Sequence, residues 1–177
     1  MAEKLIVDGK TMQRTLQRLS HEIIEQNQNS EEICLVGILR RGVSLSEILR
    51  QNIERFSELR VRTGKLDITY YRDDLEKRSA EPVIGQQEID FDVNGKNIIL
   101  VDDVLYTGRT ARAAMEALMA LGRPARIQLL VMIDRGHREL PISANYVGKN
   151  IPTARNEFVS VRVTEYDGTE GVSLITR

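Results

Sequence analysis

Apolar residues along this chain occur in short, nearly continuous runs that alternate with longer segments of helical periodicity. The run Ile98–Val101 is apolar at every position, and Ile127–Ile133 is apolar at all positions but one. Strands with this pattern are covered on both faces, as they are in parallel sheets. Their alternation with helices predicts an α/β domain with a mostly parallel sheet.

The same pattern gives the boundaries of the expected elements. The predicted strands are Ile33–Leu39, Lys65–Tyr71, Asn97–Val104, Ile127–Ile133, Tyr146–Ile151 and Phe158–Tyr166, with Leu59–Thr63 as a further candidate. The predicted helices are Met12–Gln26, Ser44–Phe56 and Arg109–Leu121. The stretch Arg72–Asp92 is polar and lacks periodicity, which predicts a long loop of the kind that often serves as a lid.

Composition places the chain among ordinary globular proteins. Its 177 residues, 41% hydrophobic and 29% charged, suit one domain spanning 1–177. The formal net charge is −1, so bulk charge favours neither nucleic acid nor a membrane surface. A site for anions would therefore depend on local clustering of the 25 Lys and Arg residues.

Cysteine usage and the N-terminus both indicate a reducing compartment without membrane insertion. Cys34 is the single cysteine and lies within an apolar run, so it is expected to be a buried small hydrophobe. The N-terminus lacks the apolar region of a signal peptide, and no apolar stretch is long enough to span a bilayer. The expected location is the cytoplasm.

One segment carries the strongest chemical signal. The buried strand that contains Ile98–Val101 ends in two adjacent carboxylates, Asp102 and Asp103, and a short loop then opens into a helix. Ligands of open α/β sheets bind beyond the carboxyl ends of the strands. A helix N-terminus offers unpaired N–H groups to a phosphate, and Thr107 and Thr110 add hydroxyl donors. Gly108 would let the backbone approach the anion closely.

The two carboxylates suit a sugar phosphate. They can accept hydrogen bonds from ribose hydroxyls or act through Mg²⁺ as oxygen ligands. The alternative is an acidic strand end followed by an ordinary capped helix. Other nucleotide sites fit less well: Gly9–Thr11 resembles the end of a P-loop, but Lys4 stands where that motif needs glycine, and no dinucleotide-binding glycine motif follows a strand.

The segment Val101–Thr110 resembles the signature with which type I phosphoribosyltransferases bind phosphoribosyl pyrophosphate (PRPP). Further blocks resemble the PyrR family of pyrimidine-operon regulators and uracil phosphoribosyltransferases, namely His21-Glu22, Asp67–Leu75, Asp134–Pro141 and Gly148–Thr153. The resemblance implies a mostly parallel sheet flanked by helices, a small hood and a mobile flap loop. It also implies formation of UMP and pyrophosphate from uracil and PRPP. The alternative is a phosphoribosyltransferase for a purine or for orotate, without a regulatory role.

The resemblance assigns roles to individual residues. Asp102 and Asp103 would hold the ribose diol, directly or with Mg²⁺ as cofactor, and Arg41 would complete the catalytic set. The residues expected to bind PRPP or UMP are Arg40, Arg41, Asp102, Asp103, Val104, Leu105, Tyr106, Thr107, Gly108, Arg109, Thr110 and Arg135. Tyr106 stands where purine-specific relatives often have an acid, which favours a pyrimidine base.

Three further segments are assigned by the resemblance. Leu39–Gly42 corresponds to a pyrophosphate loop, in which Gly42 permits an unusual backbone geometry and Arg41 offers a fork of donors. Arg40 departs from the threonine usual in the family, and a surface arginine without a function is the alternative there. Lys65–Asp92 corresponds to the flap. The chain after Ile133 corresponds to the hood, where Arg135 forms either a salt bridge or a substrate contact.

A basic stripe lies on the first predicted helix. Its apolar face carries Met12, Leu16, Leu19 and Ile23, and the opposite face carries Arg14, Arg18 and His21. Such a stripe is usually just solvated surface. The resemblance instead implies contacts to a stem-loop of leader mRNA that regulate transcription attenuation in response to uridine nucleotides. The residues expected to bind RNA are Arg14, Arg18, His21, His137, Arg138 and Lys149.

The first helix departs from the family at Gln17, where a threonine is expected, and aromatic residues that could stack on bases make up only 5% of the chain. RNA recognition would therefore rest on hydrogen bonds and shape. The resemblance further implies a homodimer or a higher homo-oligomer and no membrane partner.

Overall fold

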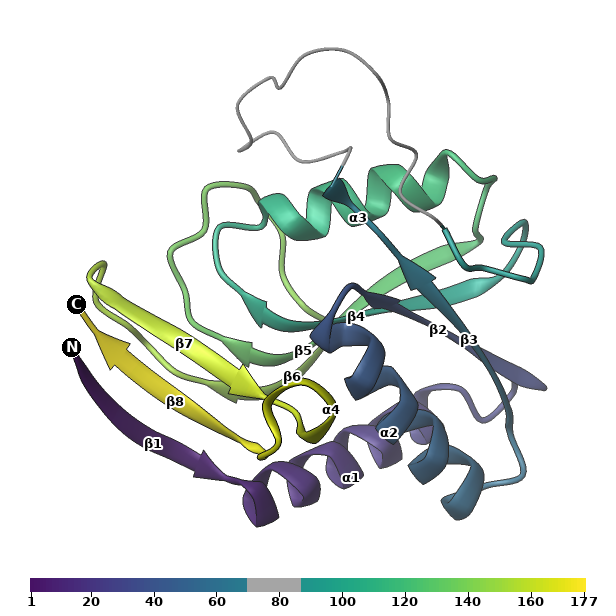
Figure 1. The fold of residues 1–177 in the computed structure, drawn as a ribbon. Helices are drawn as coiled ribbons and strands as arrows, with labels where there is room; N and C mark the ends of the chain where they lie inside the picture. The colour runs from purple at the N-terminus through teal and green to yellow at the C-terminus, as the bar shows by residue number, and fades with distance from the viewer. Residues whose placement is uncertain (70–86) are drawn as a thin grey trace.

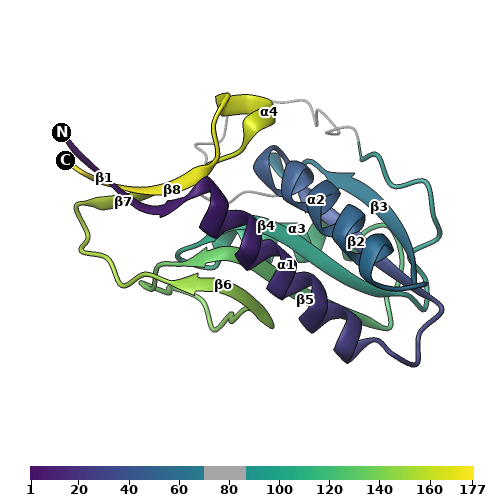
Figure 2. The ribbon, with the colours of Figure 1, turned by 90° about the horizontal axis from the view of Figure 1, so that it is seen from below.

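The computed structural model describes residues 1–69 and 87–177, and its centre is a five-stranded parallel sheet (Figure 1). The strand order is β3-β2-β4-β5-β6. The strands are β2 (Glu32–Ile38), β3 (Arg60–Leu66), β4 (Asn97–Leu105), β5 (Arg126–Asp134) and β6 (Tyr146–Asn150). Figure 2 shows α1 (Gly9–Gln26) and α2 (Arg41–Phe56) on one face, whereas α3 (Arg109–Met119) lies on the other. The predicted α/β class and parallel sheet are confirmed.

Two apolar cores form because the sheet is covered on both faces. Ile99 and Val101 of β4 pack with the apolar side chains of α1 and α2. Ile98 and Leu100, which point the opposite way, pack with the alanines of α3. This alternation explains why β4 is apolar at consecutive positions. Cys34 lies in the second core, and burial raises the pKa of its thiol, so the predicted role as a small hydrophobe is confirmed.

A second, antiparallel sheet holds both ends of the chain. It consists of β1 (Ala2–Asp8), β8 (Gly171–Thr176) and β7 (Glu157–Arg162), in the order β1-β8-β7. Figure 1 shows the two termini side by side at the tip of this sheet. The sequence pattern had not indicated β1 or β8. Most residues of β1 are exposed, whereas those of β8 are buried or partly buried, and each strand depends on pairing with the other across nearly the whole length of the chain.

Two predicted strand boundaries are wrong. The strand predicted at Phe158–Tyr166 stops at Arg162, and α4 (Thr164–Asp167) follows because the Asp167 carboxylate accepts the Val163 N–H at 2.9 Å. Of the strand predicted at Lys65–Tyr71, only Lys65 and Leu66 belong to β3 (Arg60–Leu66), residues 67–69 lie beyond its end, and Tyr70 and Tyr71 lie outside the described residues. The seven residues of β3 pair in register with all seven of β2, so the candidate Leu59–Thr63 marks the true strand.

Beyond β3 the chain forms a local turn, in which the Asp67 carboxylate accepts hydrogen bonds from the N–H and hydroxyl groups of Thr69. Most of the predicted loop and flap lies outside the described residues. Where the description resumes, Glu88 forms an antiparallel bridge with Lys65, at N···O distances of 2.9 and 3.1 Å.

The three long helices fall where the sequence predicted them, with shifted ends. Helix α1 begins three residues early because Asp8 caps it through a 2.7 Å bond from the Thr11 N–H. Helix α2 begins at Arg41 rather than Ser44, and α3 ends at Met119 rather than Leu121. Within residues 1–69 and 87–177, no helix is long and apolar enough to cross a membrane.

Candidate active site

The carboxyl ends of β2 and β4 meet at a topological switch point. The chain leaves β2 through α2 towards β3, and it leaves β4 through α3 towards β5, on the opposite side. Because the two connections diverge, they leave a crevice between the strand ends, where ligands of open α/β sheets bind. The predicted pyrophosphate loop and the predicted phosphate loop (Tyr106–Thr110) follow these two strands and therefore flank one crevice.

A cavity of about 520 Å³ occupies this crevice, and the acid pair lies at its wall. It is lined by Ile38–Arg41, Asp67, Ile68, Thr69, Asp102, Asp103, Val104 and Thr110. Both carboxylates are half-buried, and each is held by the backbone. The Asp103 N–H donates to Asp102 Oδ1 at 2.9 Å, and the Val104 N–H donates to Asp103 Oδ1 at 2.9 Å. The acid pair is thus fixed before a substrate arrives.

The phosphate loop is built around a left-handed glycine. Gly108 has φ of +94° and immediately precedes α3, so the first N–H groups of the helix open towards the loop. A side chain at this position would be strained, which gives a conformational reason for glycine besides the predicted close approach of an anion. The loop borders a second cavity of about 340 Å³, to which Val104–Ala111 and Glu139 contribute. Tyr106–Arg109 line this second cavity and not the crevice cavity, to which only Thr110 of the loop contributes.

The chain after β5 braces this loop. The Thr107 carbonyl accepts N–H groups of Glu139 and Leu140 at 2.9 and 3.1 Å, and Arg109 Nε pairs with the Glu139 carboxylate at 2.7 Å. Arg138 donates to the Tyr106 carbonyl at 2.8 Å and also pairs with Asp134. The phosphate loop is consequently held from its outer side by backbone and charged groups.

Gly42 occupies the pyrophosphate loop for a reason other than the predicted one. Its φ is not in the left-handed region, so the expectation of an unusual backbone geometry is wrong. The cause is close packing: a Cβ at Gly42 would lie 2.2 Å from the Val101 carbonyl oxygen. The start of α2 thereby touches the backbone of β4 beside the acid pair. Earlier in the same loop, the peptide bond between Leu39 and Arg40 is cis.

We expect Gly42→Ala to destabilise the protein and to raise the KM for a phosphate-bearing substrate of the crevice. The added methyl group must push α2 away from β4, and overpacking of this kind costs about 1–3 kcal/mol. Thermal unfolding and initial rates measure the two effects. Gly9→Ala is the control for a methyl group added in the first turn of a helix, because Gly9 likewise lacks a left-handed φ and a Cβ there would lie 3.2 Å from its nearest atom, the Glu170 carbonyl oxygen. An unchanged KM in Gly42→Ala would mean that the spacing between the loops does not matter for binding.

The arginines expected at the site differ in their surroundings. Arg40 is exposed, whereas Arg41 is half-buried and pairs with Asp167 of α4. Arg135 is only 5% exposed, and its guanidinium lies 3.9 Å from the Tyr106 ring centroid. It donates to the Thr153 hydroxyl at 3.1 Å and to the Glu157 carbonyl at 2.7 Å. Arg135 thus joins the phosphate loop to β7 through hydrogen bonds and a ring contact rather than through the salt bridge offered as one alternative.

The residues expected to contact RNA form two neighbouring groups. Arg14, Arg18 and His21 are exposed along α1, and the apolar residues of that helix are buried as predicted. The second group lies beyond β5 and on β6, and consists of His137, Arg138 and Lys149. The groups meet where Arg18 donates to the Gly148 carbonyl at 2.5 Å.

Several of these side chains also have structural contacts. His21 stacks on Phe56 with ring centroids 4.5 Å apart, and Arg18 pairs with Glu22 at 2.6 Å. His137 lies 2.5 Å from the Thr153 carbonyl and adopts a positive φ of 65°. Arg18 and Arg138 each pair with a carboxylate and donate to two carbonyl oxygens. Arg138 is the less available of the two, because its side chain is 24% exposed against 47% for Arg18.

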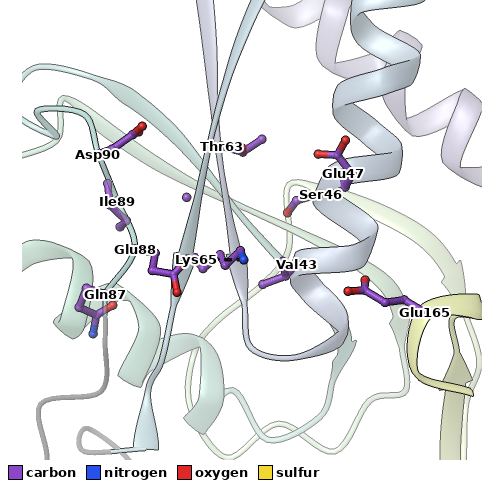
Figure 3. A pocket seen from close by; sticks show the side chains of 11 residues that line it. Val43, Ser46, Glu47, Thr63, Lys65, Gln87, Glu88, Ile89, Asp90 and Glu165 are labelled. Carbon is purple, nitrogen blue, oxygen red and sulfur yellow. Dashed lines mark ion pairs between the residues drawn. The ribbon is translucent and has the colours of Figure 1, made fainter.

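A larger cavity, of about 700 Å³, lies between α2, β3 and residues 87–90 (Figure 3). Four carboxylates line it, those of Glu47, Glu88, Asp90 and Glu165, against the single amine of Lys65, which pairs with Glu88 at 3.5 Å. This surplus of negative charge disfavours a polyphosphate. The smaller crevice at the switch point is therefore the better candidate for a phosphate-bearing substrate.

The residues expected to bind the substrate did not include all those that the fold brings to the crevice. Asp67, Ile68 and Thr69 line the cavity beside the acid pair, and the resemblance had assigned them only to the flap. Asp167 reaches Arg41 from 126 residues away. No local pattern marks Asp167, since its contact depends on which strands become neighbours.

Comparison with known proteins agrees with this architecture. Residues 4–166 match the family of the phosphoribosyl transferase domain. The Bifunctional protein PyrR of Caldicellulosiruptor bescii is 57% identical over 169 residues, which cover 96% of this chain and 93% of that protein. The protein of the same name from Clostridioides difficile is 52% identical over 175 residues, covering 98% of this chain and 99% of that protein.

Solved structures extend the likeness to the fold. The crystal structure of the hypoxanthine phosphoribosyltransferase of Trypanosoma cruzi matches with a TM-score of 0.76 at 18% identity, and the match covers 99% of this chain and 97% of that one. A hypoxanthine phosphoribosyltransferase of Staphylococcus aureus matches with a TM-score of 0.71 at 19% identity, over 98% and 92% of the two chains. The chain has the type I phosphoribosyltransferase fold and belongs to the phosphoribosyl transferase domain family, within it to the PyrR family.

Proposed function

We propose that this protein is a uracil phosphoribosyltransferase, which converts uracil and PRPP to UMP and pyrophosphate, with 1–177 acting as a single domain. The observation that carries the proposal is the crevice itself. Two carboxylates held by backbone N–H groups line it, together with Thr110 at the end of the phosphate loop and Arg40 and Arg41 of the pyrophosphate loop. A ribose that carries a phosphate on one side and pyrophosphate on the other matches these three features in order.

In the proposed reaction, N1 of uracil loses its proton and bonds to C1 of the ribose while the bond from C1 to pyrophosphate breaks, and the proton passes to the released pyrophosphate. Tyr106–Thr110 hold the 5′-phosphate through helix N–H and hydroxyl groups. Asp102 and Asp103 accept hydrogen bonds from the ribose hydroxyls. Their negative charge also stabilises the positive charge that grows on the sugar. Arg41 binds the leaving pyrophosphate. Because these groups are fixed beforehand, the reactants are oriented without further reorganisation.

The acid pair also fits a magnesium ion carried in with PRPP. Among the described residues, no cluster of three or more His, Cys, Asp and Glu side chains could hold a metal. Two carboxylates at a crevice wall match the way Mg²⁺ is usually bound, by one or two carboxylates together with substrate oxygens and water. When bound, Mg²⁺ would neutralise charge on the pyrophosphate.

A base screen tests the choice of uracil. Purified protein with PRPP and Mg²⁺ is offered uracil, hypoxanthine, guanine and orotate, and release of pyrophosphate is measured. Uracil is expected to give the highest kcat/KM, because the Tyr106 position lacks the acid that often stands in purine-specific relatives. A higher kcat/KM for a purine or for orotate would mean that this base, and not uracil, is the substrate.

Thr107→Val is expected to raise the KM for PRPP. The substitution removes the hydroxyl from the phosphate loop and preserves side-chain shape. The Thr107 hydroxyl also accepts a hydrogen bond from the backbone N–H of Arg109 at 3.3 Å, so it supports the start of α3. A hydrogen bond to a charged group contributes roughly 1.5–3 kcal/mol, which corresponds to an effect of about tenfold or more. Initial rates at varied PRPP measure it, with Thr63→Val as the control outside the crevice. An unchanged KM would place the 5′-phosphate elsewhere.

We further propose that the protein binds a stem-loop of the leader mRNA of a pyrimidine operon and regulates its attenuation in response to uridine nucleotides. The support is the exposed basic surface formed by α1 and by the chain around β6, joined through Arg18 and Gly148. Filter binding to the leader transcript, with and without UMP, tests this role. If the wild-type protein shows no specific affinity for the leader transcript, the regulatory proposal fails and only the enzymatic one remains.

Location and assembly follow as proposals from these activities. Both PRPP and nascent mRNA are found in the cytoplasm, where we place the protein. We propose a homodimer or a higher homo-oligomer as the working form, which light scattering at several protein concentrations tests directly. A molar mass that stays at the monomer value at every protein concentration would contradict the proposed oligomer.

A further inference from the structure

The short helix α4 contacts the first turn of α2 at two points. The Asp167 carboxylate takes the Arg41 guanidinium in a two-point contact, with Oδ1 to Nη2 at 2.9 Å and Oδ2 to Nε at 3.3 Å. Nearby, the Glu165 carboxylate accepts the Ser44 hydroxyl. Figure 3 shows Glu165 on α4 pointing towards the start of α2. The C-terminal sheet is thus tied directly to the pyrophosphate loop.

Asp167 is itself held in place. Its Oδ2 accepts the Val163 N–H at 2.9 Å, and Val163 is 1% exposed within the core. The side chain of Asp167 is 18% exposed, against 37% for Arg41. The hydrogen bond from Arg41 lowers the pKa of Asp167, and the reciprocal contact raises the pKa of Arg41, so both stay charged at neutral pH. A rigid carboxylate therefore holds the more exposed arginine.

The contact uses one edge of the guanidinium. Nε and Nη2 face Asp167, which leaves the Nη1 edge for another acceptor. Arg41 lines the same cavity as Asp102 and Asp103. An arginine has many rotamers, and fixing it before a ligand arrives removes that ordering cost from binding.

We propose that Asp167 is a positioning residue for the leaving group: it holds Arg41 with one edge of its guanidinium towards the pyrophosphate. The proposal rests on the proposed role of Arg41. It predicts that Asp167 affects binding of ligands that carry pyrophosphate, and not binding of the base.

Asp167→Asn in the full-length protein tests the assignment. Asparagine keeps an oxygen for the Val163 N–H but loses the charge and the second acceptor for Arg41. Loss of a charge-assisted contact predicts that the KM for PRPP rises about tenfold. In the reverse reaction of UMP with pyrophosphate, the KM for pyrophosphate should rise by a similar factor. The KM for uracil and the thermal midpoint should stay close to those of the wild type.

Ser44→Ala is the matched control, because it removes the other contact between α4 and α2 without touching Arg41. It should leave the KM for pyrophosphate unchanged. An equal rise in Ser44→Ala would assign the effect to the junction as a whole and overturn the specific role of Asp167. A fall in the KM for pyrophosphate in Asp167→Asn would also overturn it, since the carboxylate would then act by repelling the anion.

A double-mutant cycle with Arg41→Gln separates the proposals. If Asp167 acts through Arg41, the double variant should bind pyrophosphate no more weakly than Arg41→Gln alone. If the rises in the KM for pyrophosphate caused by the two substitutions multiply in the double variant, the positioning role is overturned.

The single variants separate the inference from the proposed function. If Arg41→Gln leaves the KM for pyrophosphate unchanged, the proposed role of Arg41 fails, and the inference fails with it. If Arg41→Gln raises that KM while Asp167→Asn does not, the inference alone fails. A joint loss of uracil affinity and thermal stability in Asp167→Asn would leave Asp167 a structural role only.

Discussion

Asp103→Asn is expected to reduce kcat by about 10²–10³ while the protein stays folded, in line with the loss of one preorganised electrostatic group from an active site. The substitution keeps an oxygen that can accept the Val104 N–H, so the strand end retains its local hydrogen bond. What it removes is the negative charge beside the ribose. That charge matters most when positive charge grows on the sugar, so kcat should fall more than the KM for PRPP rises.

Initial rates with PRPP, uracil and Mg²⁺ measure the effect, and circular dichroism with thermal unfolding checks the fold. Glu58→Gln is the control, since it removes an exposed carboxylate just before β3, at the opposite end of that strand from the crevice. It should leave kcat close to the wild-type value. Near-normal turnover in Asp103→Asn would contradict the role given to the acid pair.

The core of this fold could be predicted because its determinants are local. The run Ile98–Val101 is apolar at consecutive positions because alternate side chains enter two different cores. The acid pair, the phosphate loop and the start of α3 follow one another without interruption, so their chemistry could be recognised from a single stretch of sequence.

Features that depend on distant partners could not be predicted. Strand β1 forms only because β8 lies beside it, and neither shows a strong alternation by itself. The true extent of β3 follows from its register with β2. Gly42 has backbone dihedral angles that any residue can adopt. A side chain does not fit there because it would collide with the carbonyl oxygen of Val101, which lies on a different strand. The pairing of Arg41 with Asp167 likewise needs the antiparallel sheet to be in place.

The basic face of α1 could be predicted only in part. Helical periodicity placed Arg14, Arg18 and His21 on the exposed side, and the structure bears this out. It did not show that Arg18 reaches across to the Gly148 carbonyl or that His21 rests on Phe56. These contacts hold two of the three side chains in fixed positions, as recognition of an RNA shape requires.

The combined substitution Arg18→Gln and His21→Gln is expected to weaken specific binding of the leader RNA by about a hundredfold or more, since each lost contact of this kind costs about 1–3 kcal/mol. Uracil transfer should change little, because neither residue lines the crevice that holds the acid pair. Removing Arg18 also loses its bonds to the Gly148 and Val147 carbonyls, so a modest fall in thermal midpoint is expected as well.

Salt dependence separates RNA contacts from general effects. Each phosphate contact releases counterions, so the wild-type affinity should fall as salt rises, and the double variant should show a shallower slope. Arg60→Gln with Arg123→Gln removes two exposed charges near the amino ends of β3 and β5, and it should leave the specific affinity near that of the wild type. Filter binding at several salt concentrations measures both variants. An equal loss in the two, or a parallel loss of uracil transfer, would mean that the face of α1 is ordinary solvated surface, and the regulatory proposal would then lose its structural support.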